Sequence, residues 1–473
     1  MNLMPPNQDE QIIPTRQKAL TLNLDATSYG TFAEIGGGQE VSRWFFAVGG
    51  AAGTVAETVS AYDKAVSDRL YGHTTRYVSR DRLGAMLDQE FNKLREGLQA
   101  NFGDAKRFFA FADTVATRSY QKGGHGHGWL GIRFQTEPRG EPSDIIIHAN
   151  LLDSTAVGEQ AALGILGVNL IYGAFFLAEN PAKLIASLMD DLSRERVEID
   201  MVELTGPAFP NVDHRLMSLQ LVEGGLTDAA MFMPGGKVVQ PADVLYKKPI
   251  LVGRGSFRPP TNLTLDVLQR ATQQFLEEPE VRGKTPVVLA EMTLRSLTPG
   301  QEAGHEDFLA RADILCALGL NVLISRFGPY YQLADYLAAS TNGFIGIAVG
   351  LPTILEQLAD EKYYTDLPGG VLEATGRLHK RSVKMYVHPT RDLGTNQIQT
   401  LETAPPPPPW HHLGALLIET GKVVPIRSYN ESYLSIHTPD VLARIQREDS
   451  SWEKMVPAAV AEVIKTKNLF RSR

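Results

Sequence analysis

The sequence contains a single cysteine, Cys316, among its 473 residues. One cysteine forms no internal disulfide framework and no cysteine-based zinc site, and such low usage is typical of proteins in a reducing compartment. The sequence therefore predicts a cytoplasmic protein, and it supplies no pattern of residues that would identify a bound metal.

An excess of positive charge is also missing. The chain has 46 Lys and Arg residues against 54 Asp and Glu residues, which gives a net charge of −8 and a pI near 5.8. General nucleic-acid binding needs a basic surface because each phosphate of the backbone is negatively charged. We therefore expect no nucleic-acid partner, although a local basic pocket remains compatible with this composition.

Clear export and membrane signals are absent as well. Residues 1–6 are followed by Asn, Gln, Asp and Glu rather than by a basic and then an apolar region, so we expect no secretory signal. The longest apolar run, 161–178, contains Asn169 and several glycines and is flanked by Glu159 and Glu179. Acidic flanks and the lack of a tryptophan belt favour a helix buried in a protein core, with no membrane partner.

The residues that are present indicate a core-forming α/β protein. Hydrophobic residues make up 43% of the chain and charged residues 21%. Short apolar segments, many of them apolar on both faces, predict strands at 107–113, 128–135, 144–151, 197–204, 229–233, 250–253, 287–292, 321–326 and 344–349. Amphipathic segments predict helices at 80–101, 213–223, 265–278, 305–318 and 330–339. This alternation predicts mostly parallel sheets flanked by helices, in two doubly wound domains or, alternatively, one barrel-like unit.

The domain boundaries follow from breaks in this pattern. Gly235-Gly236 and Gln240-Pro241 favour a junction there, which gives an N-terminal α/β domain over 1–240 and a second α/β domain over 241–400. Five prolines at 405–409 predict a stiff spacer that opens a C-terminal extension over 401–473. A tail of this kind lies across its own or a neighbouring subunit, so we expect a homo-oligomer. Within it, 413–417 predicts a short strand or helix and 457–467 a closing helix.

The most informative segment follows the predicted strand 250–253. Arg254-Gly255-Ser256-Phe257-Arg258-Pro259 reads as a turn that leads into a helix, for which Thr261, Asn262 or Thr264 supplies the cap. Backbone N–H groups and the positive end of the helix dipole would face whatever lies above the turn. The segment therefore predicts a site for a nucleotide or another phosphorylated small molecule.

This segment resembles the opening signature of the nucleotidylyltransferases that make nicotinate dinucleotide or dephospho-coenzyme A. That signature runs Gly-Ser/Thr-Phe-Asp-Pro-x-His/Thr-x-Gly-His, and five positions fit it: Gly255, Ser256, Phe257, Pro259 and Thr261. Three positions depart from it, because Arg258 replaces the aspartate, Leu263 the glycine and Thr264 the final histidine. Loss of one preorganised donor of this kind commonly costs on the order of a hundred- to a thousandfold in rate.

The resemblance implies a reaction and roles for individual residues. Adenylyl transfer from ATP, with Mg²⁺, to a phosphorylated acceptor would place the triphosphate on Gly255 and Ser256, with Arg258, Thr261 and Thr264 as the catalytic candidates. Arg254 and Arg258 are permanently charged donors that suit a phosphate. Glu291 and Arg326 end the next two predicted strands, at the edge where α/β sheets collect ligands, and structural ion pairing is their alternative.

The whole chain is also similar to a widespread bacterial family whose members carry two conflicting names, nicotinate-nucleotide adenylyltransferase and TonB-dependent receptor. The similarity runs from Tyr-Gly-Thr-Phe-Ala-Glu-Ile at 29–35 through 254–259 and Gly-Arg-Leu at 376–378 to Ser-Trp-Glu-Lys-Met-Val-Pro at 451–457. An outer-membrane receptor needs an export signal and many amphipathic strands of about ten residues, so we reject that name. The family supplies kinship without an established activity.

Two further motifs have both a functional and a structural interpretation. Gly49-Gly50-Ala51-Ala52-Gly53-Thr54, followed by a helix-like 55–62, would either wrap a phosphate or form a closely packed helix entry. His125 and His127 are two residues apart, so on a strand both side chains would point the same way, as two metal ligands do. A third ligand would come from His148, Asp113 or Glu203. A hydrogen-bonded or solvated pair of histidines is favoured over this metal site.

Two functions remain open. In the first, the protein binds a nucleotide and transfers a nucleotidyl group with altered chemistry. In the second, the turn is inherited architecture, and the protein is a nucleotide sensor or a non-catalytic oligomeric scaffold. The sequence leaves the acceptor and the number of subunits undetermined.

Overall fold

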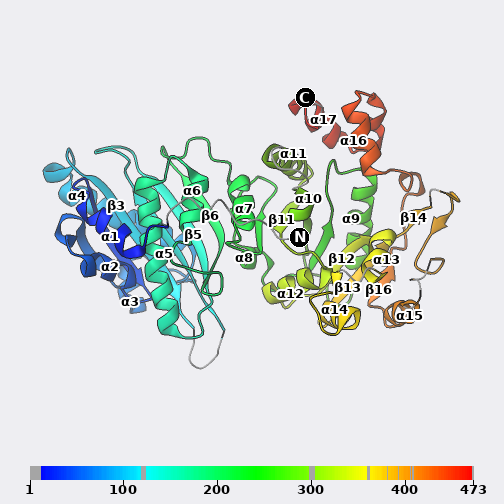
Figure 1. Cartoon of the computed structure of the whole chain (residues 1–473), viewed down its shortest axis with the longest axis horizontal. Coiled ribbons are helices and arrows are strands. Elements are labelled where there is room, and N and C mark those ends of the chain that lie inside the picture. The colour runs from blue at the N-terminus through cyan, green and yellow to red at the C-terminus, as the bar shows by residue number, and fades with distance from the viewer. Residues whose placement is uncertain are drawn as a thin grey trace. The chain divides into compact units, whose positions relative to one another are not determined.

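The computed structural model forms two compact units, Met1–Thr227 and Asp228–Arg473, which we describe separately (Figure 1). The described residues are 12–118, 124–297, 304–359, 363–380, 382–392, 394–404, 406, 408 and 410–470. The domain ranges expected from the sequence remain predictions.

The first unit is built on a six-stranded sheet in the order β2-β1-β3-β4-β5-β6. Strand β1 pairs in parallel with both β2 and β3, whereas β3 to β6 are joined by antiparallel pairs. The strands are β1 Ser28–Ile35, β2 Val55–Val59, β3 Arg107–Ala116, β4 Gly126–Phe134, β5 Ser143–Leu151 and β6 Val197–Thr205.

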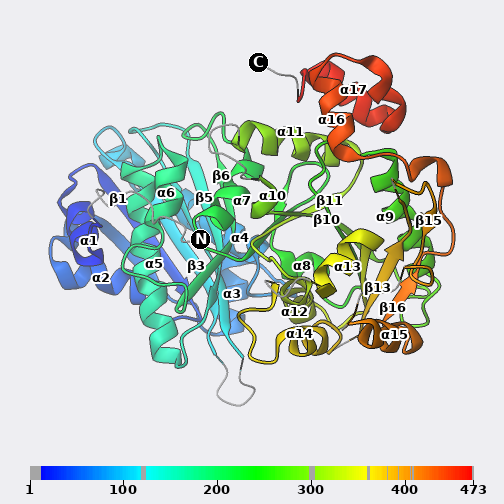
Figure 2. The ribbon, with the colours of Figure 1, turned by 45° about the vertical axis from the view of Figure 1, so that its right-hand side comes forward.

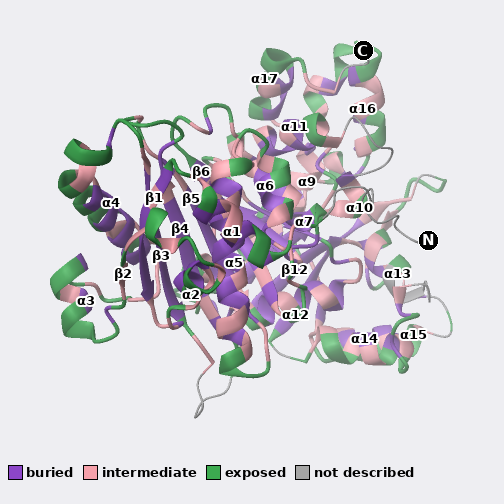
Figure 3. Ribbon diagram, turned by 60° about the vertical axis from the view of Figure 1, so that its left-hand side comes forward, coloured by how far each residue is buried: buried purple, intermediate pink, exposed green. Residues whose placement is uncertain are grey.

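Helices bury both faces of this sheet. In β3, Phe109 and Phe111 belong to the main core of the unit, while Phe108 packs with Phe91 on the opposite face. The main core is covered by helices that include α1 (Thr15–Leu24), α2 (Glu40–Val48), α5 (Ala156–Phe176), α6 (Pro181–Ser187) and α7 (His214–Glu223). Helix α4 (Arg80–Phe102) covers the other face, so the strands are buried over most of their length (Figure 3).

Helix α5 contains the long apolar run. Among the described residues it is the one helix with the length and composition of a membrane span, and 67% of its apolar window is buried in the structure. Asn169, which interrupts the run, is completely buried and accepts a hydrogen bond of 2.9 Å from Lys18. Burial against the core of the unit is what the sequence predicted for this segment.

The second unit has an eight-stranded sheet in the order β16-β13-β12-β9-β10-β11-β7-β8. The six strands from β16 to β11 are parallel, and β7 and β8 complete the sheet with antiparallel pairs. Their bounds are β7 Ala229–Phe232, β8 Val238–Val239, β9 Ile250–Arg254, β10 Val287–Thr293, β11 Asn321–Ser325, β12 Ile345–Gly350, β13 Val383–His388 and β16 Val423–Pro425.

Both faces of the parallel part are again covered by helices. Along β9, Ile250 and Val252 belong to one core cluster, and Leu251 between them belongs to a second cluster. The helices of this unit include α8 (Pro241–Leu245), α9 (Asn262–Phe275), α10 (Leu294–Leu297), α11 (Gly304–Ala317), α12 (Tyr330–Ser340), α13 (Leu351–Ala359) and α14 (Gly370–Leu378). The central strand is thus doubly covered, as the apolar character of both its faces indicates.

The C-terminal segment is part of the second unit. Pro406 is buried and lies against Gly414 of α15 (His411–Glu419), and β16 then joins the edge of the sheet beside β13 (Figure 2). Helices α16 (Thr438–Gln446) and α17 (Ala458–Lys467) share a small core with Ile314 of α11. Pro405, Pro407 and Pro409 lie outside the described residues.

The α/β class is confirmed, and all nine predicted strands and five predicted internal helices are present within a few residues of their expected bounds. Both large sheets are open, so the barrel-like alternative is wrong for the described residues. The helix expected at 55–62 is also wrong, because Val55–Val59 is strand β2. Its alternating Val-Ala-Glu-Thr-Val pattern and its β-branched residues favour pairing with β1 over a helical turn.

Candidate functional site

The turn after β9 is shaped by close packing at Gly253 and by hydrogen bonds from Arg311. A Cβ atom on Gly253 would lie 2.4 Å from Leu268, so glycine at this position lets α9 approach the strand. Phe257 is buried and has a φ of 49°, a left-handed conformation that non-glycine residues rarely adopt. Arg311, itself buried, donates a hydrogen bond of 3.1 Å to the carbonyl oxygen of Ser256 and another of 2.8 Å to that of Ser296. The turn therefore has a fixed conformation.

The turn lies where the order of the sheet reverses. Strand β9 is flanked by β10 on one side and by β12 on the other, so the chain leaves β9 towards one edge of the sheet and later returns to the opposite side. In open α/β sheets, ligands bind at such a switch point, beyond the carboxyl ends of the strands.

A pocket of about 200 Å³ occupies this position. Its walls come from the turn after β9, the start of α9, the end of β12 and the first turns of α12, α13 and α16. The lining residues are Gly253, Arg254, Gly255, Ser256, Phe257, Thr261, Leu263, Thr264, Val267, Leu268, Tyr330, Ala348, Val349, Gly350, Thr353 and Thr438. The sequence indicated the lining residues of the turn and of the start of α9, but it did not indicate Thr353 or Thr438.

Three hydroxyl groups in the pocket have no partner among the described residues. They belong to Ser256 in the turn, Thr353 in the first turn of α13 and Thr438 at the first position of α16. Helix α16 begins without a side-chain cap, so its first N–H groups are not satisfied by a side chain. These groups can donate hydrogen bonds to an anion that enters the pocket.

Thr261 and Thr264, two of the predicted catalytic residues, form the cap of α9. The Thr261 hydroxyl accepts from the Thr264 N–H at 3.2 Å, and the Thr264 hydroxyl accepts from the Thr261 N–H, also at 3.2 Å. This reciprocal arrangement is a capping box with threonine in place of the usual Glu or Gln. Both side chains line the pocket while holding the helix.

Arg258, the third predicted catalytic residue, is not among the residues that line the pocket. Its Nε atom lies 2.7 Å from Asp307 of α11, which also pairs with Arg311. About a third of the Arg258 side chain is exposed. In this structure Arg258 helps to hold the turn against α11.

The predicted cofactor-binding residues separate into two groups. Gly255 and Ser256 lie in the pocket, and Arg254 lines it, but the Arg254 guanidinium is paired with the completely buried Glu291. Arg326 is exposed and lies outside the lining. The structural interpretation of Glu291 therefore accounts for its contacts, and neither Glu291 nor Arg326 touches the pocket.

In the first unit, the histidine motif forms a hydrogen-bonded chain. His127 Nδ1 lies 3.2 Å from His148 Nε2, and His148 Nδ1 lies 2.6 Å from Asp200. The described residues contain no group of three or more His, Cys, Asp or Glu side chains that would hold a metal ion. His127 is therefore bonded to His148 rather than paired with His125, which is exposed.

Two buried carboxyl groups face one another across β1 and β3. Glu34 and Asp113 are register partners, both essentially inaccessible. Glu34 accepts from the N–H groups of Val41 and Ser42 at the start of α2, whereas one oxygen of Asp113 has no hydrogen-bond partner. Burial raises the pKa of Asp113 well above its ordinary value, and the neighbouring Glu34 adds to this effect. The two residues form a buried acidic pair inside the core of the first unit.

The glycine segment at 49–54 is folded by its own contacts. The side-chain amide of Asn23 donates to the carbonyl oxygens of Phe45 and Gly49, at 2.8 and 2.7 Å, and thereby closes the end of α2. These contacts support the closely packed interpretation of this segment.

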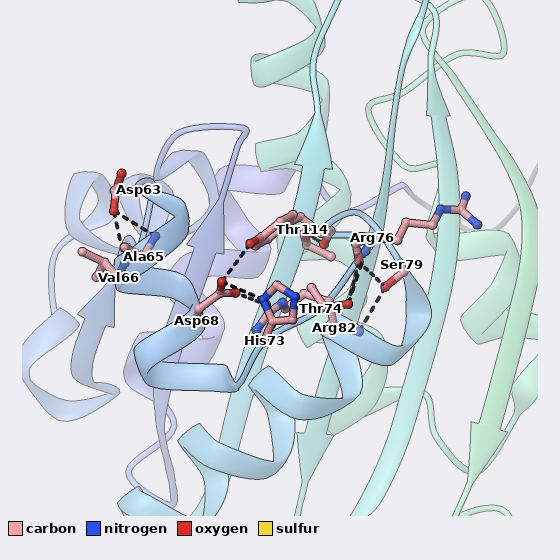
Figure 4. A network of polar contacts seen from close by, with 11 residues as sticks. Asp63, Ala65, Val66, Asp68, His73, Thr74, Arg76, Ser79, Arg82 and Thr114 are labelled. Carbon is pink, nitrogen blue, oxygen red and sulfur yellow. Dashed lines mark hydrogen bonds and ion pairs between the residues drawn. The ribbon is translucent and has the colours of Figure 1, made fainter.

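A polar network joins α3 (Lys64–Tyr71) to the start of α4 (Figure 4). Asp68 accepts from Tyr77 at 2.9 Å and from Arg82 at 3.0 Å, and the Thr114 hydroxyl donates to the Tyr77 carbonyl oxygen. Ser79 caps α4. These contacts hold the connection between two helices on the surface of the sheet. The polar side chains of the network therefore have a structural role.

Comparison with known proteins finds no matching family model and no matching curated protein. Among solved structures, the competence/damage-inducible protein CihA from Agrobacterium tumefaciens is 17% identical, with 36% of this chain and 97% of that chain covered and a TM-score of 0.24. A CinA-superfamily protein from Enterobacter cloacae is 14% identical, with 37% and 99% covered and a TM-score of 0.25. A protein from Vibrio parahaemolyticus, provisionally named nicotinate-nucleotide adenylyltransferase, is 16% identical, with 48% and 97% covered and a TM-score of 0.26. At these values the neighbours assign no activity to this chain.

Proposed function

We propose that the pocket between β9 and β12 binds a nucleotide or another phosphorylated small molecule. The observation that supports this function is the convergence of three uncommitted hydroxyl groups, those of Ser256, Thr353 and Thr438, at the carboxyl ends of two parallel strands. Thr353 and Thr438 lie in the first turns of α13 and α16, and Ser256 lies in the turn that leads from β9 to α9.

Phosphate suits this polar side of the pocket because several helices begin there. Helices α9, α13 and α16 have 14, 9 and 9 residues, so each has a developed dipole whose positive end lies at the lining. Hydroxyl and backbone N–H donors together satisfy phosphate oxygens without any change of protonation.

An apolar body suits the opposite side. Leu263, Val267 and Leu268 of α9 and Val349 of β12 line it. The volume of about 200 Å³ is below the roughly 300–1,000 Å³ of sites that enclose a drug-sized ligand. A phosphate with a sugar therefore fills the pocket, and the remainder of a nucleotide extends towards solvent.

The lining carries little positive charge, so it favours a ligand with few phosphate groups. Arg254 is the one charged residue among the described lining residues, and most of its donors are taken by Glu291 and by the Gly328 carbonyl oxygen. The lining residues that the structure describes include no carboxylate that would ligate Mg²⁺ directly. These residues do not fit a resident magnesium ion, so the proposal involves no step through one.

Nucleotidyl transfer is a second candidate, favoured by the Gly255-Ser256-Phe257 turn and by α9 at its side. In such a reaction an acceptor phosphate oxygen forms a bond to the α-phosphorus of ATP, the bond from that phosphorus to the bridging oxygen breaks, and pyrophosphate leaves. Thr264 stands where the related signature has histidine, and its hydroxyl is committed to the cap of α9. We therefore expect a slow transferase or a nucleotide sensor that performs no chemistry.

Thermal unfolding of the full chain with AMP, ATP and inorganic phosphate tests binding. A ligand at about a hundred times its Kd stabilises the folded state by roughly 2.7 kcal/mol, which is readily visible as a rise in Tm. Thr438→Val should reduce this rise, because it removes one donor from the pocket. Thr420→Val is the matched control, since Thr420 is exposed at the end of α15 and contacts the backbone of its own helix.

The absence of any Tm rise with all three ligands would exclude this site. A rise that Thr438→Val leaves unchanged would place the ligand elsewhere. If binding is present, pyrophosphate release from ATP with nicotinate mononucleotide or phosphopantetheine as acceptor separates the two candidates, because a sensor binds without releasing pyrophosphate.

A further inference from the structure

A second, smaller pocket of about 40 Å³ lies within the second unit, among α12, α13, α14, α15, β13 and β16. It is mainly apolar, with walls that include Tyr331, Tyr364, Leu378, Met385 and Leu417. Tyr330 contributes to this pocket and also to the proposed phosphate pocket, so the two lie on either side of one aromatic residue. The features that determine what the small pocket can hold are its few polar atoms.

His379 lines the pocket at the end of α14 and has a defined tautomer. Its Nδ1 atom lies 3.4 Å from the Val383 carbonyl oxygen. Because a carbonyl oxygen only accepts, Nδ1 carries the proton and Nε2 is an acceptor. The Nε2 atom is buried and has no hydrogen-bond partner among the described residues. Burial lowers the pKa of His379 to about 4, so the ring is neutral at physiological pH.

Thr375 supplies a second polar group to the same pocket. It is four residues before His379, so the two side chains lie on one face of the helix end. The Thr375 hydroxyl forms no hydrogen bond with another described residue and can donate or accept.

We propose that this His379 pocket is a second binding site, which takes a small uncharged molecule carrying a hydroxyl or amide N–H on an apolar body. The N–H or O–H of the ligand donates to His379 Nε2, and its oxygen accepts from the Thr375 hydroxyl. The aromatic and aliphatic walls contact the apolar body. A carboxylate is disfavoured because it would face an acceptor in a lining that, in the part of the chain described, contains no Lys or Arg.

The size of the pocket limits the ligand further. A dry engineered cavity of about 150 Å³ encloses a benzene ring, so 40 Å³ encloses only the polar end of a ring or a short chain. The proposal stands independently of the phosphate site, since its polar groups, His379 and Thr375, do not line that site and its ligand chemistry differs.

Phenol, benzene and benzoate form a matched set of probes. Each is titrated into the full-length chain at neutral pH, with saturation-transfer NMR as the measure of binding. One hydrogen bond that is made only by phenol should favour it over benzene by about threefold to tenfold. Benzoate should not compete for the site.

The wild-type protein also carries a direct readout. Histidine labelled with ¹⁵N should show one unprotonated Nε2 resonance that moves on addition of phenol and not on addition of benzene. In His379→Leu, phenol should bind no better than benzene, whereas Thr420→Val should preserve the preference. Thr438→Val, which addresses the phosphate pocket, should leave phenol binding unchanged.

Equal binding of phenol and benzene to the wild type would overturn the role of His379. Failure of both phenol and benzene to bind would overturn the site. If His379→Leu does not fold, as judged by circular dichroism, the ¹⁵N measurement on the wild type decides. A Tm rise with AMP or its absence has no bearing on these outcomes, so the two proposals fail separately.

Discussion

Arg254 donates two hydrogen bonds to the carboxylate of Glu291, at 2.8 and 2.9 Å, across the neighbouring strands β9 and β10. Ser325 of β11 donates to the same carboxylate at 2.6 Å, and the Arg254 guanidinium stacks 4.4 Å above the Tyr330 ring. Three adjacent strands are therefore tied together immediately below the proposed phosphate pocket. We call these contacts of Arg254, Glu291, Ser325 and Tyr330 the clamp. They hold the strand ends from which the turn after β9 begins.

Removal of the arginine should destabilise the second unit strongly. Arg254→Met leaves Glu291 as a buried charge without its partner, which commonly costs 3–5 kcal/mol, about 4 kcal/mol here. Urea unfolding of the wild type, Arg254→Met and the double variant Arg254→Met/Glu291→Gln measures this loss. The double variant should recover a large part of it, and a single variant as stable as the wild type would contradict the clamp.

Thr261 should prove to be a stability residue rather than a ligand residue. Loss of its cap in Thr261→Ala is expected to lower the free energy of unfolding by about 1 kcal/mol. The rise in Tm on addition of a phosphorylated ligand should be retained, because the hydroxyl is already committed to the Thr264 N–H. Loss of ligand binding without loss of stability would reverse this assignment.

The sequence predicted the strands of the parallel core well because they are apolar on both faces. Segments 250–253 and 287–292 are recognisable from their own residues, and the structure pairs them as β9 and β10. The short strand Val423–Pro425 was not predicted, since three residues at the edge of a sheet carry almost no local pattern. Its position is determined by pairing with β13, which lies far from it in the chain. Local periodicity does not reveal such a pairing.

The site was predictable only where it is continuous in the chain. Gly255 and Ser256 follow a strand and precede a helix, so the turn could be found from the sequence. Thr353 and Thr438 reach the same pocket from distant helices, and a threonine at the start of a helix is too common to be informative. Arg311 was missed for the same reason, because its contact with the Ser256 carbonyl oxygen depends on the packing of α11.

Asp113→Asn should stabilise the first unit at neutral pH. Because burial raises the pKa of Asp113 above that of the unfolded chain, the folded state retains a proton that the unfolded state has lost. The stability contributed by the protonated acid is fully present below about pH 4 and is lost as the pH rises through the raised value. At pH 7 the free energy of unfolding of the variant should exceed that of the wild type by on the order of 1 kcal/mol. Above about pH 4 the stability of the variant should also vary less with pH. Urea unfolding from pH 4 to 8 measures both, and a variant less stable than the wild type at pH 7 would contradict the expected sign.

His379 should make the second unit sensitive to acid. Its pKa falls from about 6.5 in the unfolded chain to about 4 in the folded protein, because the ring is buried. Between these values the unfolded state binds a proton that the folded state does not, so stability present above pH 6.5 is lost as the pH falls towards 4. The slope is up to about 1.4 kcal/mol per pH unit.

The variant His379→Gln removes this titration and should flatten the curve over the same interval. Parallel pH series of urea unfolding for the variant and the wild type isolate the contribution of this one residue, because all other titrating groups are shared. Identical slopes for the two proteins would show that His379 is accessible to protons in the folded state.

The pocket between β9 and β12 is closed by Thr438, which follows the whole sheet, the proline segment and β16 in the chain. A bound phosphate that contacts both Ser256 and Thr438 would join the middle of the chain to its last helices. Binding of the phosphate in the pocket would then slow protease cleavage of the segment between β16 and α16. In this fold the C-terminal segment would act as a reporter of the ligand as well as a wall of its site.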